Sequence, residues 1–358
     1  MKSYVNVKQL DEKNVELLPT KSDVLRVAPA YGKEFNVAGG YINWGSGWSD
    51  AEASVRYAKK LLDEEGKVTF KTGDVEKLLF ADHRDQSKVT GVSLADGTTI
   101  TADLVILATG AWTAKLVDLR GRAVSTGQAL AYIRISDEEQ KRLEHMPTVL
   151  NFATGIFIIP PRNNMLKIAR HAYGYQNPKT VPVPGGNGSM QISLPENGVP
   201  VPPEGQEAFR SALRQFLPSF AERPFVDTRV CWYTDTYVSP PSPNPVIVTQ
   251  KSTATYLTEP TRPKADFIVT PHPTFNGLFL ATGGSGHAYK FFPILGEKVV
   301  DALEGTLEAD LRELWKWPEA KSKDEFEGTE DGSRSGMKGL LLMEELAKMQ
   351  KNKRGSVL

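Results

Sequence analysis

The sequence predicts an α/β protein of two domains, and three observations carry this prediction. Residues 277–303 contain a short all-apolar run, three closely spaced glycines and an apolar pattern near helical spacing, which indicate a buried strand, a sharp turn and a helix. Residues 103–112 contain a second all-apolar run, Leu104 to Ala108, which predicts a buried strand that ends in a turn at Gly110. From Gly127 onward the pattern changes to longer strands with few helices, which predicts a separate sheet domain.

The composition excludes several classes of protein. The 358 residues are enough for one large or two modest domains. The 43 basic and 43 acidic residues balance, so we expect no nucleic-acid partner and no membrane partner. No apolar run approaches the roughly 20 residues of a membrane helix, and the N-terminus has no secretory signal. With a single cysteine and no Ser-Lys-Leu ending, we expect a soluble, cytoplasmic protein.

The first hundred residues predict one helix and a hairpin. Lys2 to Tyr31 is polar and weakly patterned, and Gly39 to Trp48 is a loop rich in glycine and aromatic residues. Ser49 and Glu52 have the spacing of a capping box, and Gly66 ends the helix that follows. One face of this helix is apolar: Val55, Ala58 and Leu62. Strands are expected at 68–71, 75–80, 89–94 and 98–101, and the pair Asp96-Gly97 predicts a tight turn between the last two.

The middle of the chain predicts the sheet domain. Strands are expected at 129–135, 149–152, 156–159, 166–170 and 226–234. Ser136 and Glu139 predict the cap of a short helix after the first of these strands. Residues 185–203 form a loop rich in glycine and proline, and an amphipathic helix that ends at Pro218 follows it.

The glycines of the last strand–turn–helix unit expose backbone. Gly283, Gly284 and Gly286 leave free N–H groups near a helix N-terminus, an electropositive setting that suits an electron-rich ligand. The glycines alone favour a plain turn about as strongly as a binding site. His287 and Lys290 favour the binding site, because they lie three residues apart on one helical face.

Four motifs, in this order, resemble one known family: ATGAW, LKIARH, CWYTDT and GGSGHAYKF. As an ordered set they resemble the sarcosine oxidase and fructosyl amino acid oxidase group, which includes amadoriases and saccharopine and pipecolate oxidases. These enzymes belong to the FAD-dependent, D-amino-acid-oxidase-like superfamily. The resemblance runs from about Gly39 to Trp317, and it implies a two-domain FAD-oxidase fold with a Rossmann-like nucleotide-binding domain and a mixed-sheet substrate domain.

The resemblance also implies cofactor residues. The ATGAW turn would lie beside FAD through Gly110, Ala111 and Trp112. The loop that borders the flavin would be Gly283, Gly284, Ser285, Gly286 and His287. Cys231 would form a thioether to the flavin, although a lone cysteine taken by itself is more often a small buried hydrophobe.

Four residues take catalytic roles by the same resemblance. Lys290 would bind a substrate carboxylate, and Lys167 would activate oxygen. His171 shares the face of Lys167 if the strand continues, and Tyr233 shares the side of Cys231, because side chains alternate along a strand. Taken alone, Lys167 and His171 favour ordinary surface positions. The five histidines show no metal-ligand spacing, so we expect no metal site.

We expect the following division of the chain: a partial FAD-binding domain at 1–126, the substrate domain at 127–235, a proline-rich insertion at 236–264, a return to the FAD-binding domain at 265–317, and a charged surface tail at 318–358. No G-x-G-x-x-G motif follows a strand near the N-terminus, so we expect the nucleotide-binding domain to be incomplete. The insertion is either real or a retained intron.

The function implied is FAD-dependent oxidation of a secondary amine C–N bond, with oxygen as the second substrate and an imine and hydrogen peroxide as products. The candidate substrates are fructosyl amino acids, saccharopine, pipecolate and N-methyl amines. Two alternatives stay open: an oxidoreductase that forms an alkaloid in specialised metabolism, and a non-catalytic remnant of such an oxidase. The sequence leaves the oligomeric state open.

Overall fold

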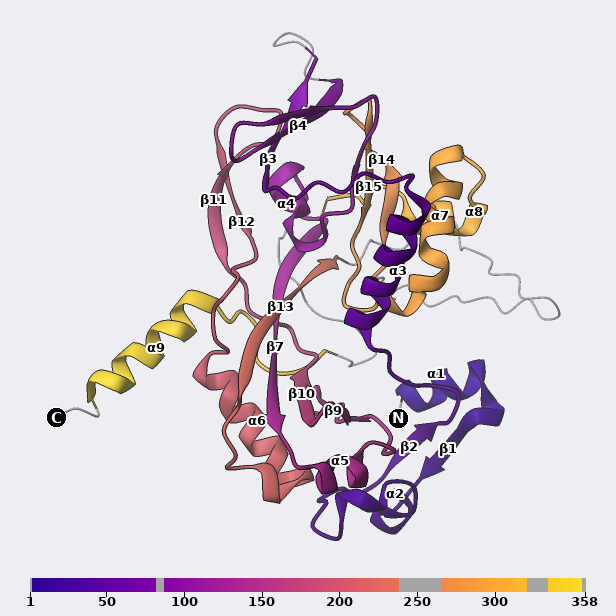
Figure 1. Ribbon diagram of the computed structural model, residues 1–358, viewed down its shortest axis with the longest axis vertical. Coiled ribbons are helices and arrows are strands. Elements are labelled where there is room, and N and C mark those ends of the chain that lie inside the picture. The colour runs from indigo at the N-terminus through magenta and orange to yellow at the C-terminus, as the bar shows by residue number, and fades with distance from the viewer. Residues whose placement is uncertain (1, 82–86, 238–264, 321–333, 356–358) are drawn as a thin grey trace.

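The computed structural model describes residues 2–81, 87–237, 265–320 and 334–355, and it divides into a lower and an upper part (Figure 1). The two longest strands, β7 (Ala123–Arg134) and β13 (Asp227–Thr236), pair antiparallel and run from the lower part toward the upper one. They therefore connect the two halves of the molecule. The predicted proline-rich insertion falls almost entirely outside the described residues.

The lower part is built on a five-stranded sheet in the order β13-β7-β10-β9-β8. The remaining strands are β8 (Val149–Leu150), β9 (Ile156–Arg162) and β10 (Met165–Arg170). All of its pairings are antiparallel, so this sheet is not the mixed sheet that was predicted. The sequence could not distinguish the two cases, because direction depends on connections and not on the apolar pattern. Helices and several sheets together still give the predicted α/β class.

One face of this sheet packs on the largest core of the described chain. Helix α6 (Pro203–Phe216) covers it, and α5 (Asp137–Leu143) begins with the predicted Ser136–Glu139 capping box. The N-terminal residues join this core through Leu18, Val24 and Phe35. They form α1 (Lys2–Leu10), β1 (Val15–Leu18), α2 (Lys21–Val27) and β2 (Gly40–Asn43), none of which the weak sequence pattern predicted.

The upper part contains two three-stranded sheets and a hairpin. One sheet joins β14 (Ile268–Pro271), β15 (Leu278–Thr282) and β6 (Val105–Leu107), and β15 lies parallel to β6. The segments around residues 103–112 and 277–303 are therefore neighbours, as the predicted fold requires. The second sheet joins β3 (Val75–Phe80), β4 (Val89–Leu94) and β5 (Thr99–Thr101) through the expected turn. The other helices here are α4 (Thr113–Leu116), α7 (Phe292–Glu304) and α8 (Ala309–Trp315).

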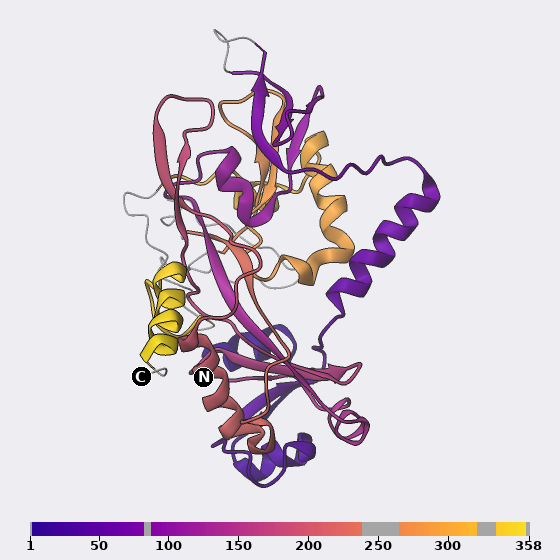
Figure 2. The same ribbon diagram turned by 60° about the vertical axis from the view of Figure 1, so that its left-hand side comes forward.

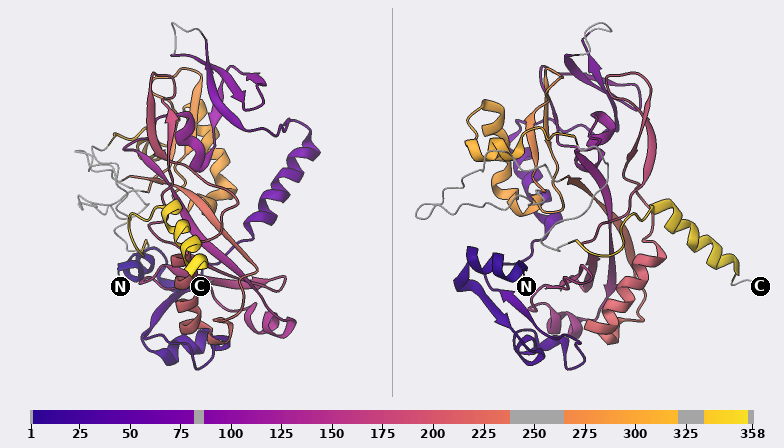
Figure 3. Two further views of the ribbon diagram at one scale, coloured as in Figure 1. Left: turned by 90° about the vertical axis from the view of Figure 1, so that its left-hand side faces the viewer. Right: turned by 180° about the vertical axis from the view of Figure 1, so that it is seen from behind.

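Several predicted elements need correction. Residues 68–71 form no strand, and Asp50, not Ser49, caps α3 (Ala51–Glu65) by accepting from the Ala53 N–H. Helix α3 stands apart from both sheets (Figures 2 and 3), so its apolar residues are exposed and its pattern does not mark a core. The loop at 185–203 contains β12 (Ser189–Ser193), which pairs with β11 (Pro178–Pro182).

Two further expectations about burial were wrong. The strand around β6 is buried at Leu107, but Leu104 and Ile106 are exposed. The predicted surface tail is partly buried, because Arg334, Leu340 and Leu342 are less than 9% exposed. Helix α9 (Leu342–Gly355) begins on the core, where Glu345 is buried and Leu346 packs, and its far end projects away from the lower part (Figure 3). Charge composition does not reveal such a buried segment.

His272 stabilises the turn between β14 and β15 in its neutral form. Its ring Nδ1 accepts hydrogen bonds from the backbone N–H groups of Thr274 (3.2 Å) and Phe275 (3.0 Å). The ring also stacks on Phe275, with 4.4 Å between centroids, and contacts the edge of Trp317. Burial, assisted by the nearby Arg122 charge, lowers the pKa of His272 to about 4.

We predict that this histidine makes stability fall as the solution is acidified. Its folded pKa lies below the unfolded value of about 6.5, so the unfolded state takes up the proton first. The stabilisation is complete above about pH 6.5 and is lost between pH 6.5 and pH 4, to a total of up to about 3 kcal/mol. His272→Asn keeps an acceptor near the Nδ1 position without titrating in this range. The free energy of unfolding, measured with denaturant from pH 4 to pH 7, should therefore depend less steeply on pH in this variant than in the wild type. His145→Asn is the control, because the His145 side chain is 86% exposed; equal slopes in all three proteins would contradict the prediction.

Candidate functional site

The strand register brings four predicted residues to one face of the antiparallel sheet. Lys167 of β10 pairs with Tyr132 of the neighbouring strand β7, and Tyr132 pairs in turn with Asp227 of the next strand, β13. Directly opposed residues share a face, and every second residue returns to it. Lys167, Cys231 and Tyr233 therefore lie on one face, and the alternate residues of β7 and β10 lie in the core on the other. His171 comes just after β10, yet its ring centroid is 6.1 Å from that of Tyr233.

Lys167 and Cys231 influence each other on this face. Both side chains are half-buried. Burial lowers the pKa of Lys167, and the neighbouring Cys231 opposes that shift. Burial likewise raises the pKa of the Cys231 thiol, while Lys167 and then Arg229 oppose the rise. The thiol is therefore partly accessible and has two cations near it, but burial outweighs them and its pKa is raised overall, which favours the less reactive protonated form.

The glycine loop lies against Tyr233. The Ser285 N–H donates to the Thr234 carbonyl at 3.0 Å, and the Thr236 N–H donates to the Ser285 hydroxyl at 3.2 Å. Gly286 has a φ of +75°, and a Cβ on it would overlap the ring of Tyr233. Glycine is required here both for the backbone angle and for the close approach. The tyrosine ring is itself largely buried, and that burial raises its pKa to about 12.

His287 and Lys290 lie at the exposed end of the loop. His287 stacks on Phe267 with 5.2 Å between ring centroids, and burial by this neighbour lowers its pKa. Lys290 belongs to a short 3-10 turn at 288–291, where residues three apart share a face, and its side chain is exposed. The predicted pairing of His287 with Lys290 on one face is therefore compatible with the turn.

The ATGAW turn is attached to the end of β15. The hydroxyl of Thr113 donates to the Gly110 carbonyl at 2.7 Å and lies 3.0 Å from the hydroxyl of Thr282. Gly110 has a φ of +50° and open space where a Cβ would stand. Ala111 is buried, whereas Trp112 is 42% exposed. Gly110 therefore presents bare backbone next to the strand that leads into the glycine loop.

One ionic group at this site was missed by the sequence reasoning. The Asp235 carboxylate pairs with the Arg334 guanidinium, and both side chains are 1% exposed. The hydroxyl of Thr126 donates to the other oxygen of Asp235. Burial raises the pKa of Asp235, and Arg334 opposes that rise. Asp235 was visible in the CWYTDT motif, but nothing in the sequence near Arg334 marked it.

The residues present fit a flavin ring. Gly110 has room where a Cβ would stand, and the strand that follows its segment in space leads into Gly284 and Gly286, although Gly286 already packs against Tyr233. A partly accessible thiol stands on the neighbouring sheet face. The groups that would hold the ring edge are thus backbone N–H and C=O groups, which suit the alternating donors and acceptors of a flavin pyrimidine.

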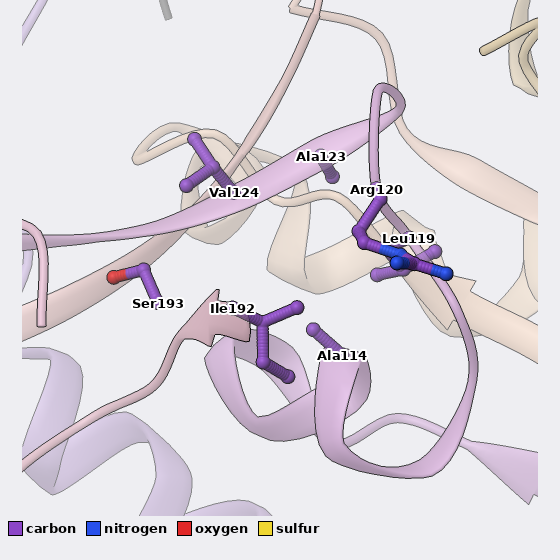
Figure 4. Close-up of a pocket in the computed structure, with 7 residues that line it drawn as sticks. All are labelled: Ala114, Leu119, Arg120, Ala123, Val124, Ile192 and Ser193. Atoms are coloured by element: carbon purple, nitrogen blue, oxygen red, sulfur yellow. The ribbon is translucent and has the colours of Figure 1, made fainter. Parts of the chain in front are cut away.

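One small cavity lies away from the residues above. A cavity of about 10 Å³ lies among α4, the start of β7 and β12 (Figure 4), room for about one water molecule. Ala114, Leu119 and Ile192 line it, and no predicted site residue does. Among the described residues there is no group of three or more His, Cys, Asp or Glu that could hold a metal ion. Within the same residues, every helix is too short or too polar to span a bilayer.

An upper part with paired glycine turns, joined to an antiparallel sheet, defines the class of two-domain FAD-dependent oxidoreductases. The chain belongs to this family: the model described as DAO, FAD dependent oxidoreductase, matches residues 2–302. A modified fructosyl peptide oxidase from Aspergillus nidulans superposes with a TM-score of 0.79 at 28% identity, over 96% of this chain and 74% of that one. The fructosyl peptide oxidase of E. terrenum gives a TM-score of 0.78 at 25% identity, over 96% of this chain and 72% of that one.

Curated relatives agree with this assignment. The amino acid oxidase imqH of Aspergillus flavus is 29% identical over 324 residues, which is 78% of this chain and 62% of the relative. The L-saccharopine oxidase of Schizosaccharomyces pombe is 26% identical over 80% of this chain and 62% of the relative. The chain thus spans about 62% of the length of these two proteins. The predicted FAD-oxidase fold and family are confirmed, whereas the roles of individual site residues stay predictions.

We predict that Gly286→Ala is more destabilising than Gly305→Ala. Both glycines have a φ of +75°, so each substitution costs about 1 kcal/mol in backbone strain. Only at Gly286 does the new methyl group meet the ring of Tyr233, since Gly305 has open space. The excess cost should be about 1–3 kcal/mol, as for other overpacked sites. Chemical denaturation measures both variants, and equal losses would show that the loop does not press on Tyr233.

We also predict that Lys167→Met makes the Cys231 thiol less reactive. Lys167 opposes the rise of the thiol pKa more strongly than Arg229 does, and the substitution removes its charge. In flavin-free protein, the midpoint of the pH–rate profile for iodoacetamide should therefore move to higher pH. Cys231 is the only cysteine, so the alkylated site is unambiguous. Arg229→Gln should shift the midpoint less and Lys179→Met not at all; an unmoved midpoint in Lys167→Met would contradict the electrostatic coupling.

Proposed function

We propose that this protein oxidises the C–N bond of a secondary amine, in an N-substituted amino acid such as a fructosyl amino acid, saccharopine, pipecolate or an N-methyl amine. The substrate loses two electrons and two protons to become an imine, and oxygen gains both to become hydrogen peroxide. An amine oxidation within specialised metabolism is a variant of the same chemistry. The cytoplasmic location inferred from sequence stays a prediction.

One observation supports this proposal above the others. Lys167, Cys231 and Tyr233 share a sheet face, His171 lies beside Tyr233, and the glycine loop covers the same ring. Four residues from two motifs, LKIARH and CWYTDT, and the loop of a third thus lie in one neighbourhood. Relatives named as saccharopine oxidase, sarcosine oxidase and fructosyl peptide oxidase support an amine substrate.

Each residue has a distinct role in the proposal. When bound, FAD supplies the acceptor for the hydride that leaves the carbon beside the nitrogen. Cys231 would tether it by a thioether, formed with loss of the thiol proton and one hydrogen of a flavin methyl group, the two electrons passing to oxygen as hydrogen peroxide forms. Lys290, which is exposed, pairs with the substrate carboxylate. The ammonium of Lys167 stabilises the negative charge that oxygen acquires with its first electron, and its half-buried position strengthens that effect. Tyr233 and His171 face the substrate.

The test is a peroxide-coupled assay of flavin-loaded protein over the four amine classes. We expect turnover with at least one class. Lys167→Met should keep anaerobic reduction by the amine but slow reoxidation in air roughly 100-fold, the order of loss for a deleted charge-stabilising group. Lys179→Met is the matched control, because Lys179 pairs with Glu196 on a surface hairpin.

Two outcomes would overturn parts of the proposal. Protein that takes up flavin but turns over none of the four classes would favour the non-catalytic alternative. Flavin that is released by acid precipitation from the wild type and from Cys231→Ser alike would exclude the covalent link.

A further inference from the structure

Arg334 contacts three separate segments that carry predicted site residues. Its guanidinium pairs with Asp235, two residues after Tyr233, and Nη1 donates to the Ala172 carbonyl at 3.1 Å, next to His171. Nη2 also donates to the Ser285 carbonyl in the glycine loop at 3.2 Å. The guanidinium carbon lies 4.9 Å from the centre of the Tyr233 ring. One planar group thus joins β13, the end of β10 and the loop.

The burial of this group makes its geometry fixed. Arg334 and Asp235 are 4% and 1% exposed as whole residues, so neither side chain can turn to water. A guanidinium presents its donors in a rigid fork, and it can therefore satisfy a carboxylate and two carbonyls only if these acceptors keep their spacing. Thr126 on β7 fixes the second oxygen of Asp235. The arrangement fixes the ring of Tyr233 relative to the loop.

We infer that Arg334 is a positioning residue for the candidate active site: it holds Tyr233, the loop at Gly284 to Gly286 and the backbone beside His171 in their relative places. The segment that follows it supports this role, since Ser335 forms a β-bridge with Ala172. The C-terminal segment therefore completes the site and is more than a surface tail. This inference rests on the proposed function for its kinetic consequence, but its structural consequence can be measured without any substrate.

A purely structural role would predict something different. A buried ion pair stabilises a fold only modestly, and its loss mainly leaves one charge unpaired. If Arg334 contributed only an ion pair, replacing another paired arginine would change stability and activity in the same way as replacing Arg334. Arg170, which pairs with Glu204, is buried like Arg334, but it is unsuitable as a control because it is adjacent to His171. Arg223, which forms a two-bond pair with Glu139 at the far end of the sheet domain, is the better control.

The experiment compares Arg334→Gln, Arg334→Lys and Arg223→Gln in flavin-loaded protein. Hydrogen exchange is measured for peptides covering 234–236 and 283–287, which contain the Ser285 and Thr236 amides bonded across the two segments. We expect exchange there to rise at least about tenfold in Arg334→Gln and to stay unchanged in Arg223→Gln. With the amine that is turned over, kcat/KM should fall about 10- to 100-fold, because small misplacements of positioning groups cost that much.

Arg334→Lys separates charge from positioning. Its ammonium can neutralise Asp235 but cannot reach both carbonyls in a fork. We expect its melting temperature to return close to that of the wild type while kcat/KM stays low, a split that a structural role alone would not give. If Arg334→Gln does not fold, Arg334→Lys carries the exchange and kinetic comparison. Exchange and kcat/KM in the Arg334 variants within twofold of those in Arg223→Gln would overturn the inference. If no amine is oxidised, the proposed function fails, and the exchange measurement still decides whether Arg334 orders the loop.

Discussion

A buried carboxylate on β13 constrains the whole site. Removing an ionised carboxylate from water costs several kcal/mol even after relaxation, so Asp235 can remain charged only with a partner that is equally buried. That partner, Arg334, comes from a segment 99 residues further along the chain. The fold must therefore bring the C-terminal segment, the glycine loop and β13 together at one point. Packing in both halves of the molecule depends on that meeting point, because β13 runs through both.

The second constraint is the register of β13 on β7. Cys231 pairs with Gln128 and Asp235 with Val124, an unbroken run of ten pairs. A slip of one residue would turn Cys231, Tyr233 and Asp235 into the core and bring Val230 out of it. The apolar face that packs against α6 therefore fixes the polar face opposite. The chemistry of the site is specified by the burial of residues that take no part in it.

Sequence reasoning succeeded where a local pattern determines the structure. The strand, glycine turn and helix at 277–303 follow from an apolar run and three glycines, and the capping box at Ser136 follows from side-chain spacing. The alternation along β13 correctly placed Cys231 and Tyr233 on one side. Reasoning failed where long-range packing decides. Nothing local in the charged region around Arg334 reveals that it is buried, and nothing local in α3 reveals that its apolar face is exposed.

Lys167 and Cys231 are both half-buried on the same sheet face, and each affects the charge state of the other without forming a full ion pair. Burial alone favours the neutral amine and the neutral thiol, so it moves the two pKa values toward each other. Each group opposes the shift of the other, because a thiolate favours an ammonium and the reverse. The result is a coupled pair whose charge state depends on whatever occupies the space beside it. An electron-rich group placed there would favour the charged lysine, and consumption of the thiol in a covalent bond would remove the thiolate that supports it.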